Sequence, residues 1–158
     1  MVKYIFLIVM SLGLISCAGD KPYDEHADAG AGIQQAKVEA KQQNKPLLII
    51  FGANWCSDCR ALNNAIEQSQ DAIKIANEFK IVKVNVGNFD KNLEIVNAYG
   101  NPIAGGIPGA AILAADHSLL YVTKPGELSN AIRARESSLY TFLTNHVNTT
   151  NGIIHKGS

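Results

Sequence analysis

The chain has 158 residues, 14 basic against 14 acidic side chains, and a hydrophobic share of 47%. This length and apolar content suit one compact domain with a buried core. A net charge of zero provides no field that attracts nucleic acid, so we expect no nucleic-acid partner and recognition of other partners by direct contact.

The amino terminus has the features of a signal peptide. Residues 1–3 are a short basic start, and residues 4–14 form an almost unbroken apolar run. A helix that crosses a membrane needs about 20 apolar residues, so this run is too short to span. We expect residues 1–16 to be a signal peptide and the mature protein to be exported.

The segment Leu14-Ile15-Ser16-Cys17 resembles the bacterial lipobox. The resemblance implies that Cys17 is acylated on its sulfur and anchors the mature protein to a membrane. An ordinary secretory signal cleaved between Ala18 and Asp20 is the alternative. In such lipoproteins an aspartate after the cysteine tends to hold the protein at the inner membrane. Because Ala18 stands there, the resemblance implies the outer membrane, facing the periplasm.

Three further segments follow from composition. Residues 17–32 are small and polar, which predicts a flexible tether. Residues 33–147 have the size of a single domain. The polar end, residues 148–158, predicts a disordered tail.

Within the domain, helical and strand patterns alternate. The patterns predict, in chain order, a helix over 33–43, a strand over 47–51, helices over 57–68 and 71–79, a strand over 80–86, a helix over 93–99, strands over 110–114 and 119–123, and a last helix within 128–146. This order predicts an α/β fold in which a central mixed sheet is flanked by helices on both faces.

The sequence has a pair of cysteines, Cys56 and Cys59, at the start of a predicted helix. With two residues between them on one helical turn, their sulfurs can come within bonding distance. The helix N-terminus favours the thiolate of Cys56, the form that attacks disulfides. Half of a zinc site is the alternative, but structural zinc needs four ligands and the sequence has no second ligand pair. We therefore expect redox chemistry and no metal.

The segment from Phe51 to Arg60, Phe-Gly-Ala-Asn-Trp-Cys-Ser-Asp-Cys-Arg, resembles the active-site segment of the thioredoxin family. A second motif of that family, a cis-proline before a strand, matches Gly106-Ile107-Pro108. A proline that merely opens a strand is the alternative. The resemblance covers most of residues 33–146 and implies a thioredoxin-like fold.

The resemblance also implies roles for individual residues. Cys56 would attack a partner disulfide, Cys59 would resolve the mixed disulfide, and the cycle would need no cofactor. Trp55 would face the partner, although a packing role is the alternative. Ile107, beside Pro108, would offer its backbone groups to an extended partner segment.

Two features bear on the direction of the reaction. Thioredoxins have a buried aspartate six residues before the first cysteine, where this chain has Ile50. Lys83 would then lack its usual acidic partner and could be a strand-end charge at the surface. Asp58 places negative charge near Cys56, which would stabilise the disulfide and favour a reductase or isomerase over an oxidase. A capping role of Asp58 at the helix start is the alternative.

The sequence thus predicts a membrane-anchored thiol–disulfide oxidoreductase. Its partners would be disulfide-containing envelope proteins, with apocytochromes among the candidates, and a membrane thiol electron donor would reduce it again. A binding module that keeps the fold and holds a structural Cys56–Cys59 disulfide is the alternative.

Overall fold

Strand β1 (Leu47–Gly52) lies at the centre of a four-stranded mixed sheet in the computed structural model, which describes residues 21–133 and 138–154. It pairs in parallel with β2 (Lys80–Asn85) and antiparallel with β3 (Gly109–Leu113). β4 (Leu119–Val122) pairs antiparallel with β3, so the order is β2-β1-β3-β4. Every residue of β1 is buried, which explains its continuous apolar sequence.

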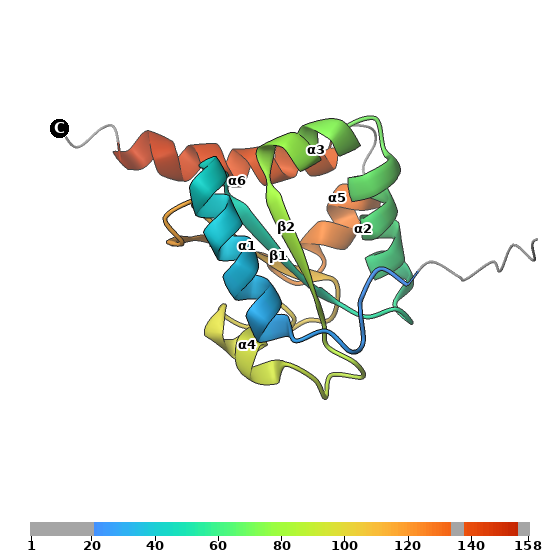
Figure 1. The fold of residues 1–158 in the computed structure, drawn as a ribbon. Coiled ribbons are helices and arrows are strands. Elements are labelled where there is room, and N and C mark those ends of the chain that lie inside the picture. The colour runs from blue at the N-terminus through green and yellow to red at the C-terminus, as the bar shows by residue number, and fades with distance from the viewer. Residues whose placement is uncertain (1–20, 134–137, 155–158) are drawn as a thin grey trace, which may run out of the picture.

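Helices cover both faces of this sheet (Figure 1). One face packs against α1 (Ala29–Gln43) and α4 (Leu93–Ala98). The other packs against α2 (Ser57–Gln68), α3 (Ala72–Glu78), α5 (Glu127–Arg133) and α6 (Ser138–Ile154). Alternate residues of β1 supply the two cores: Leu48 and Ile50 face the α2 side, whereas Leu47, Ile49 and Phe51 face the α1 side. The expected fold class is confirmed.

The domain begins earlier than the composition predicted. α1 starts at Ala29, because the Asp28 side chain accepts a hydrogen bond from the N–H of Ala31 at 2.9 Å and caps the helix. Before it, Tyr23 is only 2% exposed and belongs to the core on the α2 side. Residues 21–32 are therefore part of the folded domain and not a tether; residues 17–20 lie outside the described residues.

The carboxyl-terminal part also differs from expectation. Two helices, α5 and α6, replace the single helix expected within 128–146, and α6 continues to Ile154. The expected disordered tail is thus helical over 148–154, because extending an existing helix adds a hydrogen bond for each residue fixed. Residues 155–158 lie outside the described range.

The predicted signal peptide and the Cys17 anchor lie outside the described residues as well. Among the helices that the structure does describe, none is long and apolar enough to cross a membrane.

Candidate active site

Cys56 and Cys59 lie where β1 leads into α2, as the sequence predicted. Both are free thiols; Cys56 is 6% exposed and Cys59 is fully buried. Cys56 is the N-cap of α2, and its sulfur accepts a hydrogen bond from the backbone N–H of Cys59 at 3.1 Å. The sulfur thus takes the place of the side-chain oxygen that usually accepts a backbone N–H at a helix N-cap.

The predicted proline motif lies against this thiol. The Ile107–Pro108 peptide bond is cis. The Cys56 thiol donates a hydrogen bond to the carbonyl oxygen of Ile107 at 3.6 Å, across 51 residues of sequence. The two motifs meet because β1 and β3 are antiparallel neighbours, with Phe51 opposite Gly109, so the end of one strand lies beside the start of the other.

Trp55 is held at the surface next to Cys56. The residue is 55% exposed, and its Nε1 donates a hydrogen bond to the carbonyl of Gly87 at 2.9 Å. Phe89, which is 43% exposed, meets the ring edge-on with centroids 6.1 Å apart. The sequence analysis missed Phe89; an aromatic residue inside the polar turn Gly-Asn-Phe-Asp was the available signal. The two rings form an exposed aromatic pair beside the thiols.

Tyr23 lies behind the thiols and was also missed. Its hydroxyl lies close enough to the Cys59 thiol for the two groups to influence each other's pKa. Burial raises the pKa of Cys59 well above its usual range, and the hydrogen bond with Cys56 adds to the effect. Burial also raises the pKa of Tyr23. A lone aromatic residue in the small, polar segment 18–32 was the only sequence signal for this contact.

Asp58 turns away from the thiols toward α5. Hydrogen bonds from Ser129 and from Arg133, the latter at 2.8 Å, lower the pKa of its carboxyl group. The carboxylate therefore remains charged, but its charge is shared with the Arg133 guanidinium. This pairing weakens the expected electrostatic effect of Asp58 on Cys56.

Because the Asp58 charge is already paired with Arg133, we expect Asp58→Asn to change the reduction potential of the cysteine pair by less than about 15 mV. This is half of the 30 mV that corresponds to about 1.4 kcal/mol for a two-electron couple. The variant should lose less than about 1 kcal/mol of stability, since the Asp58–Arg133 pair is partly exposed and screened by solvent. Equilibration with glutathione and urea denaturation measure the two effects. A shift of several tens of millivolts toward a more oxidising potential would show that the Asp58 charge acts directly on the Cys56 sulfur, as the sequence predicted.

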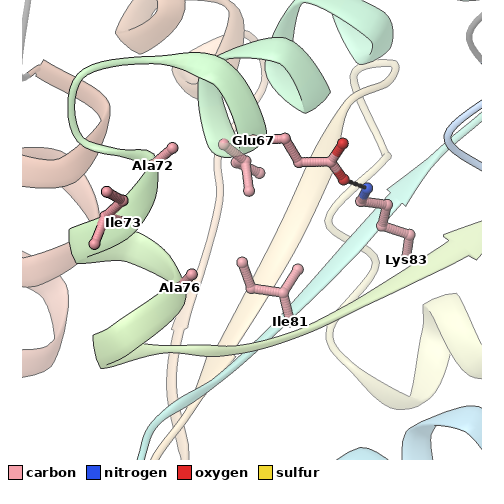
Figure 2. Close-up of a pocket in the computed structure, with 7 residues that line it drawn as sticks. Glu67, Ala72, Ile73, Ala76, Ile81 and Lys83 are labelled. Carbon is pink, nitrogen blue, oxygen red and sulfur yellow. Dashed lines mark hydrogen bonds and ion pairs between the residues drawn. The ribbon is translucent and has the colours of Figure 1, made fainter.

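Lys83 has partners that the sequence analysis did not predict. It lies opposite Ile50 on the neighbouring strand, and Ile50 is 1% exposed in the core. The Lys83 ammonium donates hydrogen bonds to Asn63 and Glu67 of α2. Figure 2 shows the Glu67–Lys83 pair beside an apolar groove between α2, α3 and β2. Lys83 therefore ties β2 to α2, and its hydrogen bond lowers the pKa of Glu67.

The described residues include no group of three or more His, Cys, Asp or Glu side chains that could hold a metal ion. The groups next to the two sulfurs are the Cys59 N–H, the Ile107 carbonyl and the Tyr23 hydroxyl.

Comparisons with known proteins agree with this geometry. A family model described as thioredoxin-like matches residues 28–115. Among solved structures, a disulphide isomerase from Xylella fastidiosa Temecula1 has a TM-score of 0.74 and 44% sequence identity, covering 80% of this chain and 96% of that chain. The C-terminal domain of DsbD from Neisseria meningitidis, in its reduced form, has a TM-score of 0.50 and 18% identity over 68% of this chain and 93% of its own, and is similar in fold alone.

Curated relatives match shorter stretches. A thioredoxin from Rickettsia bellii (strain RML369-C) is 38% identical over 63 residues, which cover 39% of this chain and 54% of that protein. The thiol:disulfide interchange protein DsbD from Campylobacter jejuni (strain RM1221) is 27% identical over 75 residues, covering 45% of this chain and 13% of that protein. The chain thus spans less than two thirds of the length of these relatives.

Proposed function

Because the chain belongs to the thioredoxin-like family, we propose that it is an exported, membrane-anchored thiol–disulfide oxidoreductase that reduces or isomerises disulfides of envelope proteins. One observation carries the proposal: the Cys56 sulfur, at the N-terminus of α2, accepts the Cys59 N–H at 3.1 Å and contacts the carbonyl of Ile107. This arrangement places the attacking sulfur at a helix N-terminus and one helical turn from a second thiol, as two-cysteine disulfide exchange requires.

The reaction proceeds in two exchanges. The Cys56 thiolate attacks one sulfur of a partner disulfide, forms a mixed disulfide and releases the other partner sulfur as a thiolate. Cys59 then loses its proton and attacks the Cys56 sulfur, which forms the Cys56–Cys59 disulfide and releases the second partner sulfur. Two electrons pass to the partner, and its two sulfurs take up the protons that the protein dithiol gives up. A thiol donor returns the protein to the dithiol.

The surroundings of Cys56 suit contact with a polypeptide partner. Trp55 and Phe89 offer exposed aromatic area, which anchors many interfaces. On the other side, we assign Ile107 and Pro108 the role of positioning an extended partner segment along backbone groups, a mode that recognises main chain more than sequence.

Features of the amino terminus and of the relatives support the location. Residues 1–16 have the pattern of a signal peptide, and Cys17 would anchor the mature protein, with Ala18 favouring the outer membrane, facing the periplasm. Relatives named as a thiol:disulfide interchange protein and a disulphide isomerase support partners that contain disulfides. We further propose that a membrane thiol donor reduces the protein again.

Ile50 favours one other function. This hydrophobic residue takes the position of the buried acid that assists proton transfer in thioredoxins. A binding module with a structural Cys56–Cys59 disulfide would not need such an acid. The equilibrium reduction potential of the pair separates the two functions, measured by titration of the protein against glutathione and dithiothreitol. We expect reversible two-electron exchange closer to about −270 mV than to about −120 mV. A disulfide that resists reduction far below these values would establish the module.

A further inference from the structure

Among the described residues, the Tyr23 hydroxyl is a neighbour of the Cys59 thiol that can donate a hydrogen bond to it. Tyr23 is 2% exposed and packs in the same core as Cys56, Cys59 and Ile50. The proposed reaction requires Cys59 to become a thiolate inside this core, where burial opposes negative charge. A donor at this position therefore bears directly on the second exchange.

Tyr23 packs closely against the segment from the end of β1 to Asn54. A side chain at Gly52 would collide with the Tyr23 ring, because a Cβ atom there would lie 2.4 Å from the Tyr23 hydroxyl. The Asn54 side chain accepts the Tyr23 N–H at 3.0 Å and donates to the Tyr23 carbonyl at 2.8 Å. The backbone of Tyr23 is thus fixed to the loop that leads into Cys56.

The hydroxyl can donate but is poorly suited to accept a proton. Burial and the neighbouring cysteines raise the pKa of Tyr23, so the phenol keeps its proton throughout the reaction. Its hydrogen bond lowers the pKa of Cys59 and so opposes the effect of burial. Ile50, also in this core, has no group that could do the same.

We propose that the Tyr23 hydroxyl donates a hydrogen bond to the Cys59 sulfur as this sulfur becomes a thiolate, and so speeds release of the partner from the mixed disulfide. This role rests on the proposed oxidoreductase function. In the step, the S–H bond of Cys59 breaks, the Cys59–Cys56 bond forms and the Cys56–partner bond breaks. The partner sulfur leaves with the electron pair and takes up a proton. Tyr23 itself is neither oxidised nor deprotonated.

The reaction of the reduced protein with 5,5′-dithiobis(2-nitrobenzoate) separates the two exchanges. Attack by Cys56 releases one coloured thiolate, and attack by Cys59 on the resulting mixed disulfide releases a second. The experiment uses the full-length protein in mild detergent with Cys17→Ser, so that only the two active-site thiols react. Tyr23→Phe should leave the first phase unchanged and slow the second at least about tenfold, which corresponds to about 1.4 kcal/mol. The pH profile of the second phase should move to higher pH, because the thiolate of Cys59 loses a donor.

Two further variants complete the test. Tyr121→Phe is the matched control, because the Tyr121 hydroxyl donates to Glu127 instead of a cysteine; it should leave both phases unchanged. Gly52→Ala keeps the Tyr23 hydroxyl but displaces the ring, so this variant should also slow the second phase. If Tyr23→Phe does not fold, Gly52→Ala tests whether the position of the Tyr23 hydroxyl matters for this phase. A second phase with unchanged rate and pH profile in a folded Tyr23→Phe overturns the role of Tyr23 alone. Two coloured thiolates released in Cys59→Ser, or none in the parent protein, overturn the exchange chemistry itself.

Discussion

Cys59→Ser is expected to leave the protein covalently attached to its partners through Cys56. The serine hydroxyl cannot attack the mixed disulfide, while the Cys59 backbone N–H that supports the Cys56 sulfur at 3.1 Å is retained. Release of the partner through the second exchange should therefore stop. Non-reducing electrophoresis of cells that express the variant should show new high-mass species, which disappear on reduction and whose partners mass spectrometry identifies.

The matched controls separate trapping from binding. Cys56→Ser and the double variant with Cys59→Ser should both give no covalent species, because the attacking sulfur is absent. If Cys59→Ser shows no covalent partner in spite of normal folding, and Cys56→Ser loses partner binding, the binding module replaces the oxidoreductase.

Gly109→Ala should destabilise the protein by about 1–3 kcal/mol, the usual cost of overpacking a tight interior. A Cβ atom at this position would lie 2.3 Å from the carbonyl oxygen of Pro102 and 3.0 Å from a side-chain carbon of Ile103. Because the first of these contacts is with backbone, either the 101–107 loop or the start of β3 must shift. The shift would move Pro108 relative to Cys56, so the reaction with disulfides should also slow. Urea denaturation at constant m-value measures the loss of stability.

Gly32→Ala is the control for this variant. Gly32 lies in α1, where the nearest atom to an added Cβ is 3.9 Å away on Val82. Alanine there should stabilise the protein by about 0.5–1 kcal/mol, because glycine is unfavourable within a helix. Equal stability of the two variants would contradict the close approach of Pro102 to β3.

Local patterns predicted most of the fold. The continuous apolar run of β1 and the amphipathic spacing of α2 are properties of a few adjacent residues, and both elements form within a residue of the expected bounds. The cysteines and Pro108 were predicted from short motifs. Strand pairing then places the motifs together.

The contacts that adjust the site were less predictable. Arg133 pairs with Asp58 across 75 residues, and no local pattern indicates which of the arginines reaches it. Tyr23 is a single aromatic residue in a polar segment, and the composition of that segment predicted a tether. Only the tertiary structure shows that Tyr23 is buried and that Gly52 leaves room for its ring. The acidic partner of Lys83 was also not predicted, because this carboxylate comes from α2 and not from β1.

The position of Trp55 has a practical consequence for observing the reaction. It is the only tryptophan of the chain, and it directly precedes Cys56, with its indole fixed by Gly87 and in contact with Phe89. Light absorbed at the red edge of the protein spectrum is therefore emitted by a single reporter at the reacting sulfur. Disulfides quench nearby indoles by accepting an electron from the excited state, so the protein carries its own optical signal of each turnover, without an attached dye.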